Sequence, residues 1–590
     1  MSFIPSPALA RDAGPHLRVN QLGYRVRDAK VAVAFSGAAL PARFALVAAD
    51  TGRVVFEGEV RGVPGGWGRF GKHAELDFSA FETPGRYFLR LGLAESRRFE
   101  VGAAVYARLP DELLEFMRQQ RCGYNPFLDA ACHTFDGRTA YGPAPAGTYL
   151  DATGGWHDAG DQLKYLLTSS NATAQMLLAY QLAAGPRQGR SARANFKDDF
   201  DAWGRKRANG TPDLLDEARW GLGWMLKLHP EPGHLYHQVA DDRDHIGWRL
   251  PQNETADYGW GKGSYRVVYF ADGAPQGLKA FKSESDGVAN LAGRYAAAMA
   301  LGYQVWRDDP RDSAYAQSLL RAGVEVYALG RAKEGVQQGN SYGAPYRYAE
   351  TTWADDMEWG AAELYRATGE RRYLADAARY ARRAAAESWM GRAEAGHYQF
   401  YPFMNVGHFR LYEVADRGLR GELAGFYREG IERCVKAGAA NPYQLGVPFI
   451  WCSNNLVAAL ATQVLLYERM TGDRRYRRFA AAQGDWLLGR NPWGVSMFTG
   501  LPDGGVWPRD PHIFTNQLLK REVRGRLVDG PVYMKIFQSL KGVGITEPDP
   551  LAPFHDDRAV YHDDIKDYST NEPTMDGTAS AILLWALLGE

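Results

Sequence analysis

A chain of 590 residues, 45% of them hydrophobic and 23% charged, is long enough for two to four domains with sizeable cores. Lysine plus arginine and aspartate plus glutamate both number 69, so the net charge is zero, which removes the electrostatic argument for nucleic acid or an anionic membrane as partner. No apolar run approaches the roughly 18–20 residues that a membrane-spanning helix needs.

The first 15 residues are predicted to be a tail or the remnant of a signal peptide. They begin MSFIPSPALARDAG and lack both the basic region and the full apolar region of a complete signal peptide. The segment PALA resembles the small residues that precede a cleavage site.

Residues 16–103 are predicted to form a small β-sandwich. Short runs rich in Val, Phe, Leu and Tyr, such as KVAVAFSG and GRYFLRLG, are separated by turn-forming segments such as DTG and TPG. Several short strands at this spacing are typical of a sandwich. Because we find no row of aromatic residues in it, we expect this domain to brace its neighbour rather than to bind carbohydrate.

Residues 104–590 are predicted to form a second, mainly helical domain. Thr211 and Pro212 mark the start of one helix, as its N-cap and first residue. Two similar segments, LYRATGERRY from Leu364 and LYERMTGDRRY from Leu466, each end one helix and begin the next, which indicates a ring or stack of helix pairs. Further helices are predicted at 287–306, 313–331, 354–367, 371–388, 453–470, 474–488 and 576–588. Long connections at 250–285 and 489–530 are predicted to be functional loops.

Two acidic motifs lie far apart in this domain. GGWHDAGDQLKY (154–165) contains Asp158 and Asp161, and DYSTNEPTMDGTAS (567–580) contains Glu572, about 410 residues later. In this order, and with VNQLGY opening the β domain, they make nearly the whole chain resemble glycoside hydrolase family 9. The resemblance implies an immunoglobulin-like β-sandwich followed by an all-α (α/α)6 barrel.

The resemblance also implies roles for the three carboxyl groups. It makes Asp161 the general base, Asp158 a group that helps to hold the attacking water, and Glu572 the general acid of an inverting reaction. Hydrolysis of a glycosidic bond needs such an acid and base, and Glu572 would need a raised pKa to be protonated. Without the motifs, the alternative interpretation is that the two aspartates are ordinary turn residues. Glu572 would then be an N-capping or solvated acid before the last helix.

Four residues beside the first motif are suited to a metal. Cys122, Cys132, His133 and His157 offer two thiolates and two imidazoles, the closed donor set of structural zinc. Some members of the family carry zinc in this way, and we expect it to fix the catalytic loop. The alternatives are a disulfide between Cys122 and Cys132, or buried thiols and core histidines.

Two further expectations concern cysteines and calcium. Cys434 and Cys452 are predicted to be buried thiols, with a bridge between them as the alternative. Calcium is common in the family, but no EF-hand-like spacing occurs here and no ligands are assigned.

Candidate sugar-binding residues are one histidine and three aromatic residues. In WPRDPHIFTNQ, His512 is retained, whereas Ile513 and Phe514 stand where relatives commonly have a second His and an Arg. Tyr568, Trp353 and Trp156 are predicted platforms for sugar rings, with core packing as the alternative for each Trp.

We therefore expect a secreted or periplasmic, monomeric endo-β-1,4-glucanase acting on cellulose or related β-glucans. The altered segment after His512 leaves an exo-acting β-glucosidase or exo-glucosaminidase as the alternative. A non-catalytic glycan-binding protein would be expected to lack Asp161 or Glu572, and both are present. A hydrolase that uses zinc as its catalyst is a further alternative.

Overall fold

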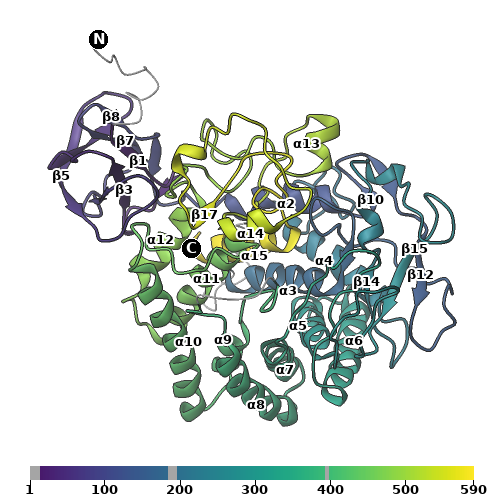
Figure 1. The fold of residues 1–590 in the computed structure, drawn as a ribbon. Coiled ribbons are helices and arrows are strands. Elements are labelled where there is room, and N and C mark those ends of the chain that lie inside the picture. The colour runs from purple at the N-terminus through teal and green to yellow at the C-terminus, as the bar shows by residue number, and fades with distance from the viewer. Residues whose placement is uncertain (1–13, 184–195, 393–397, 590) are drawn as a thin grey trace.

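The computed structural model describes residues 14–183, 196–392 and 398–589. An N-terminal β domain lies beside a larger helical domain, and the two acidic motifs belong to the latter (Figure 1). No helix in these three ranges is both long and apolar enough to cross a membrane.

The β domain is a sandwich closed around its own apolar core. Strand β5 pairs with both β4 and β6 and so joins the two halves, in the order β1-β3-β6-β5-β4-β7-β9-β2, with β8 beside β7. Leu46, Leu76 and Leu89 lie in the core between the halves. The strands are β1 His16–Arg18, β2 Gly23–Tyr24, β3 Val31–Ser36, β4 Arg43–Ala48, β5 Val54–Gly62, β6 Lys72–Asp77, β7 Gly85–Leu91, β8 Ala94–Glu95 and β9 Phe99–Val101.

The helical domain is a closed double ring. Each inner helix contacts the next in the order α3, α5, α7, α9, α11, α15, and α15 contacts α3 again. The outer helices α4, α6, α8, α10, α12 and α2 pack on them one by one. The helices are α2 Leu109–Gln120, α3 Leu166–Ala183, α4 Asp213–Lys227, α5 Ala289–Trp306, α6 Ser313–Ala332, α7 Ala354–Thr368, α8 Arg371–Glu387, α9 Gly407–Tyr412, α10 Arg417–Gly438, α11 Ser453–Thr471, α12 Arg477–Leu487, α13 Phe514–Leu519, α14 Met534–Ser539 and α15 Met575–Leu588.

Position in the ring explains the residue patterns of the helices. The outer helix α8 buries Tyr373, Ala377 and Tyr380 at helical spacing and exposes its charged face. The inner helix α3 is buried on nearly every side, so it has no polar face. Helix α4 begins at Asp213, one residue after Pro212, so Thr211 is not its N-cap.

Small sheets stand on one end of the ring. A four-stranded sheet has the order β12-β15-β14-β13, and β15 lies inside the predicted 250–285 loop. Two-stranded pairs are β10 with β11 and β16 with β17. The bounds are β10 Gly123–Asn125, β11 Ala130–Cys132, β12 Asp136–Ala140, β13 Lys164–Tyr165, β14 Tyr236–Val239, β15 Arg266–Phe270, β16 Val532–Tyr533 and β17 Ala559–Val560, with short 3-10 helices η2 Asp242–Asp244, η3 Pro251–Asn253 and η4 Ala552–Phe554.

The β domain is tied to the ring by buried polar contacts. Asn20 Nδ2 donates to Asp485 Oδ1 at 2.8 Å, and the backbone N–H of Gln21 donates to the carbonyl of Leu488 at 2.8 Å. The backbone N–H of Val506 donates to Gln21 Oε1 at 2.8 Å. These contacts favour the expected bracing role of the domain.

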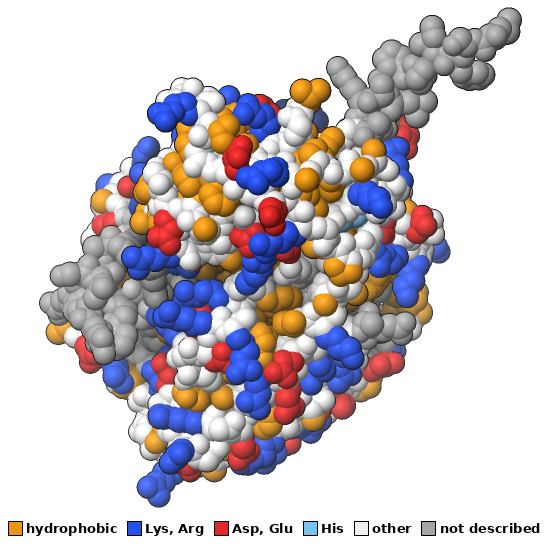
Figure 2. All heavy atoms as spheres, turned by 90° about the vertical axis from the view of Figure 1, so that its left-hand side faces the viewer, with side chains coloured by type: hydrophobic (Ala, Val, Ile, Leu, Met, Phe, Trp, Pro, Cys, Tyr) orange, Lys and Arg blue, Asp and Glu red, His pale blue; other side chains and the backbone are white. Residues whose placement is uncertain are grey.

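The face that presents the β domain carries charges of both signs. Figure 2 shows Lys and Arg side chains interspersed with Asp and Glu over this face, in line with the net charge of zero. Such a surface lacks the broad basic patch with which proteins attract a polyanion.

Asp485 is predicted to make the domain contact sensitive to pH. Burial raises the pKa of its carboxyl group to about 7. Folding therefore favours the protonated form, and the stability that this group contributes falls as the pH rises from about 4 to about 7. Asp485→Asn should increase the free energy of unfolding at pH 8 by about 1–3 kcal/mol relative to wild type. Thermal unfolding at pH 4.5 and 8 measures this, and an equal change at both pH values would contradict it.

Candidate active site

The first acidic motif begins with a turn that only glycine can make. Gly155 has a φ of +74°, and a Cβ atom on it would lie 2.6 Å from the indole ring of Trp224. The turn is followed by His157, by the two aspartates and then by β13 and α3. The Gly-Gly pair therefore positions the segment that carries Asp158 and Asp161.

The two aspartates of this motif differ in exposure. Asp158 is buried, and its carboxylate accepts hydrogen bonds from the hydroxyl groups of Thr168 and Tyr348. The side chain of Asp161 is 9% exposed, and its Oδ1 accepts from the backbone N–H of Leu163 at 3.2 Å. Its Oδ2 lies 3.3 Å from His245 Nε2. Asp161 is thus the more exposed of the two aspartates.

The second motif meets the first through Gly160. The backbone N–H of Gly160 donates to Glu572 Oε1 at 2.9 Å. A Cβ atom on Gly160 would lie 2.8 Å from the same oxygen and would clash with the carbonyl of His512. Glycine is required here because three chain segments approach one another closely. The structure therefore brings Asp161 and Glu572 into one site, as the motifs predict.

Glu572 has the environment of a general acid. Burial raises its pKa well above the usual value, and the nearby charges of Asp161 and Asp529 raise it further. The N–H of Gly160 opposes this shift by bonding to Oε1. Because Oε1 accepts the hydrogen bond from Gly160, the proton of the neutral carboxyl group belongs on Oε2. Asp529 itself is buried and accepts from the indole N–H of Trp451 at 2.8 Å.

His512 is held as a neutral hydrogen-bond acceptor. Its Nδ1–H donates to the carbonyl of Ile565, and burial lowers its pKa. This tautomer leaves the Nε2 lone pair for a hydroxyl group. The imidazole packs on Trp248, with ring centroids 4.6 Å apart, and lies near Tyr568 at 5.9 Å. His512 and Tyr568 thus lie together beside Glu572.

The two residues after His512 are buried in the core. Ile513 and Phe514 are buried and form a small apolar cluster with Phe116. The positions where relatives commonly have a second His and an Arg are therefore core positions in this chain.

Two of the predicted sugar platforms are wrong. Trp156 is completely buried, and its indole N–H donates to Glu217 Oε1 at 2.7 Å. Trp353 is 5% exposed at the start of α7 and packs against Tyr380 and the guanidinium group of Arg383. Neither ring offers a free face to a sugar. Core packing, the alternative stated for both, describes them.

Three site residues carried no recognisable sequence motif. His245 and Trp248 come from the loop after β14, and Tyr346 comes from the loop before α7. Tyr346 packs against His245 with ring centroids 5.0 Å apart, and its pKa is raised by burial and by the charge of Asp161. The only available signal was a concentration of Gly, Tyr, Trp and His in long connections.

The four zinc-suited residues come together as the spacing predicts. The candidate ligand atoms of Cys122, Cys132, His133 and His157 all lie within 4.8 Å of one another, and all four residues are buried. Both cysteines are free thiols, so the alternative of a disulfide is wrong.

The distances within this group suit a shared metal ion. His133 Nδ1 lies 3.6 Å from Cys122 Sγ and 3.2 Å from His157 Nε2. Glu254 Oε2 lies 3.2 Å from His133 Nε2, an outer carboxylate of the kind that orients metal-bound histidines. The donor set therefore fits zinc.

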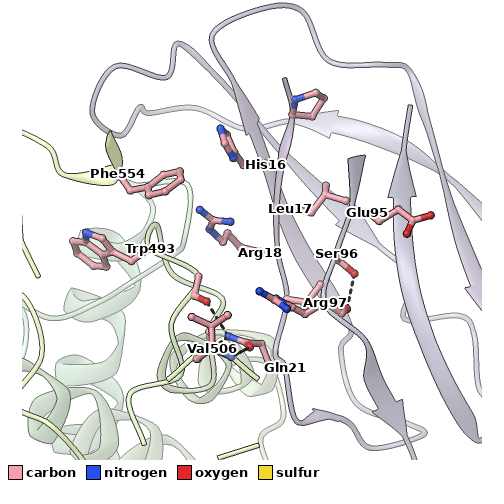
Figure 3. A pocket seen from close by; sticks show the side chains of 14 residues that line it. His16, Leu17, Arg18, Gln21, Glu95, Ser96, Arg97, Trp493, Val506 and Phe554 are labelled. Carbon is pink, nitrogen blue, oxygen red and sulfur yellow. Dashed lines mark hydrogen bonds between the residues drawn. The ribbon is translucent and has the colours of Figure 1, made fainter. Parts of the chain in front are cut away.

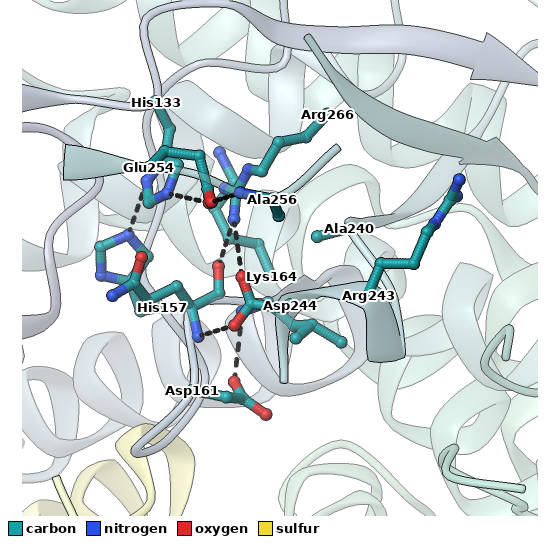
Figure 4. A network of polar contacts seen from close by, with 12 residues as sticks. His133, His157, Asp161, Lys164, Ala240, Arg243, Asp244, Glu254, Ala256 and Arg266 are labelled. Atoms are coloured by element: carbon teal, nitrogen blue, oxygen red, sulfur yellow. Dashed lines mark hydrogen bonds and ion pairs between the residues drawn. The ribbon is translucent and has the colours of Figure 1, made fainter. Parts of the chain in front are cut away.

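A buried charge network joins this group to the catalytic loop (Figure 4). Arg266 forms a two-point ion pair with Asp136, at 2.7 and 2.8 Å, and Lys164 Nζ lies 2.8 Å from the same carboxylate. Arg266 also donates to the carbonyl of Gln162, whose N–H donates to Asp244 at 2.9 Å. Gln162 follows Asp161 directly, so the network fixes the backbone of the general base candidate.

A second group of possible metal ligands is better explained by hydrogen bonds. Asp549, His555 and His562 lie close together. The indole N–H of Trp493 donates to His555 Nδ1 at 3.0 Å, so a neutral His555 carries its proton on Nε2 and donates it to Asp549 at 2.9 Å. That ring has no lone pair left for a metal. His562 donates from Nδ1 to Asp567 at 2.7 Å and so supports the second motif.

No group suited to calcium is found among the described residues. The two clusters that could hold a metal ion both contain histidine. Calcium prefers ligand shells made of oxygen atoms. We therefore assign no calcium ligands. Cys434 and Cys452 are both buried free thiols, so the alternative of a bridge between them is wrong.

Comparisons with known proteins identify both domains. The model of the family described as glycosyl hydrolase family 9 matches residues 106–586, and that of the cellulase N-terminal ig-like domain matches residues 12–96. Endoglucanase C of Cellulomonas fimi is 28% identical over 97% of this chain, which spans only 52% of that relative. A xyloglucan-specific endo-β-1,4-glucanase of Bacteroides ovatus, BoGH9A, is 28% identical over 90% of this chain and 86% of its own.

Solved structures agree with this result. A metagenome-derived glycoside hydrolase family 9 endoglucanase matches with a TM-score of 0.75 at 28% identity, over 98% of this chain and 99% of its own. A Zn-binding triple mutant of the family 9 endoglucanase J30 matches with a TM-score of 0.72 at 25% identity, over 96% and 99%. The predicted fold class, an immunoglobulin-like domain followed by an (α/α)6 barrel, is confirmed.

The contact at Gly160 can be tested by adding one methyl group. In Gly160→Ala, the new Cβ would push away Glu572 Oε1 and the backbone of His512, and we expect activity to fall at least about 100-fold. Gly223→Ala is the matched control, because Gly223 lies in α4 with open space around it, and it should keep full activity. Hydrolysis rates of both variants test the expectation, and circular dichroism checks that both variants are folded. Wild-type rates in Gly160→Ala would show that this contact is not required.

Proposed function

The chain belongs to glycosyl hydrolase family 9, and from this premise we propose that it is an extracellular endo-acting β-1,4-glucanase that hydrolyses its substrate with inversion. The observation that carries the proposal is Glu572, whose pKa is raised well above the usual value beside the accessible Asp161. A protonated carboxyl group and a second carboxyl group in one site are what glycoside hydrolysis requires.

In the proposed reaction, Glu572 transfers its Oε2 proton to the glycosidic oxygen as the bond to the anomeric carbon breaks. Asp161 accepts a proton from a water molecule, which attacks the anomeric carbon from the opposite face. The product sugar then has inverted configuration, and the two carboxyl groups return to their starting states by proton exchange with solvent. We propose that Asp158 helps to hold the water, since each of its oxygens keeps one lone pair beside the bonds from Thr168 and Tyr348.

Substrate contacts near the cleaved bond are proposed for His512, Tyr568 and Trp248. Neutral His512 would accept a sugar hydroxyl group at Nε2, and the two aromatic rings beside it would pack against sugar faces. The inward packing of Ile513 and Phe514 removes contacts that relatives commonly have, so the glycan preferred here need not be plain cellulose. The relatives named above are endoglucanases, so we do not favour the exo-acting alternative.

We further propose that Cys122, Cys132, His133 and His157 hold a structural zinc ion. Four protein ligands complete a tetrahedral shell and leave no position for a catalytic water. The ion would then supply no chemistry to the reaction. Its role would be to hold His157, and with it the turn that leads to Asp158 and Asp161.

The catalytic assignment is tested by conservative substitutions. We expect Glu572→Gln and Asp161→Asn to lower the hydrolysis rate at least about 100-fold, because each removes a proton-transfer group. The exposed Glu59→Gln is the control and should leave the rate unchanged. Substrates would be carboxymethyl-cellulose, barley β-glucan, xyloglucan, cello-oligosaccharides and chitosan oligomers.

Product analysis decides between the alternatives. Mixed oligosaccharides released from a polymer, with the α-anomer appearing first in proton NMR, would establish inverting endo action. Glucose or glucosamine released only from short oligomers would instead establish an exo-enzyme. Wild-type rates in both carboxyl variants would show that the site is misplaced.

The zinc proposal is tested by metal analysis and thermal unfolding. Wild-type protein should contain about one zinc per chain, whereas Cys122→Ser should lose it and unfold at a temperature several degrees lower. Cys434→Ser, a buried thiol outside the group, should keep its zinc. Zinc-free wild-type protein would refute the proposal. A chelator that stops hydrolysis without lowering the unfolding temperature would favour catalytic zinc instead.

A further inference from the structure

A cavity of about 490 Å³ lies where the β domain meets the helical domain (Figure 3). One wall comes from β1 and the segment 95–97, and the other comes from the loop after α12 and from Phe554. Cavities of this size accept small organic molecules, and this one lies outside the catalytic site.

Arg18 enters this cavity as a cation without an acidic partner. Its Nε donates to the carbonyl of Pro492 at 2.8 Å, and its guanidinium group lies over the rings of Phe35 and Phe554. No carboxylate pairs with Arg18 in the part of the chain that the structure describes. Burial lowers its pKa to about 10, which reflects the cost of placing this charge against apolar walls.

A second arginine faces the same space. Figure 3 shows the guanidinium groups of Arg18 and Arg97 directed into the cavity, whereas the carboxylate of Glu95 is directed away from it. Gln21, another polar residue of the wall, bonds to Gly494 and Val506 across the domain contact. The cavity therefore presents two guanidinium groups and no anion to match them.

An oxyanion held between two guanidinium groups that face one cavity would form charge-assisted hydrogen bonds with both of them. Guanidinium groups match the planar geometry of carboxylates. The volume corresponds to several water molecules at about 30 Å³ each, which leaves room for more than an inorganic ion.

We propose that this cavity binds a small organic acid, of the size of a uronate or a tricarboxylate, through Arg18 and Arg97. Because its walls come from both domains, the bound acid holds the β domain and the helical domain together. Binding therefore stabilises the folded chain by mass action and does not depend on the proposed glycosidase activity.

The test is thermal unfolding and titration calorimetry of the full chain. Glucuronate, citrate, inorganic phosphate and neutral glucose would each be added at about 10 mM, with ionic strength matched by sodium chloride to remove general screening. We expect glucuronate or citrate to raise the unfolding temperature by about 2 °C or more, and glucose to leave it unchanged.

Two variants make the test specific. Arg97→Gln removes an exposed guanidinium group with no ion pair in the described structure, so it should fold normally and bind the acid about tenfold more weakly. Arg53→Gln, an exposed arginine of the same domain outside the cavity, should bind like wild type. The proposal is overturned if neither acid binds, if only phosphate binds, or if Arg97→Gln binds as tightly as wild type.

Discussion

The site depends on one hydrogen bond between residues 412 positions apart, from the Gly160 amide to Glu572. This contact requires the last inner helix, α15, to close the ring against α3, because Glu572 lies just before α15 and Gly160 just before α3. It also requires a residue without a side chain at position 160. The same amide holds one oxygen of Glu572, so burial and neighbouring charge act on a carboxyl group of fixed orientation.

The catalytic segment is supported from the opposite side by buried polar groups. The zinc-suited residues hold its start at His157, and the ion pairs of Arg266 with Asp136 hold its end through Gln162. Buried charges of this kind stabilise little in themselves, because desolvation offsets most of their attraction. Their effect is geometric: removal of any one partner leaves a charge unpaired, so the network permits one arrangement of the loop.

Much of the fold could be predicted because outer helices such as α8 and strands such as β9 bury one face only. The apolar residues of α8 recur at helical spacing, so this helix can be recognised in the sequence. Helix α3 is buried on nearly all sides and contains Ser, Thr and Asn, so it shows no such pattern. Asp161 and Glu572 could be predicted because each lies in a sequence motif, and the order of the two motifs indicated the family. Nothing local marked His245, because its position depends on a loop folding back over Asp161. Trp156 was misjudged because a tryptophan beside a motif can equally serve its packing.

Closure of the ring also fixes when the enzyme can first act. Glu572 and the helix α15 that follows it come later in the sequence than every other inner helix of the ring. A chain still being synthesised lacks Glu572, the proposed acid, so the proposed reaction requires α15 to have been made and docked first. Cleavage by a protease ahead of Glu572 would remove the acid together with α15, while most of the barrel stayed on the larger fragment. With Glu572 as the proposed acid, this order of residues would keep the enzyme inactive until the whole barrel is assembled.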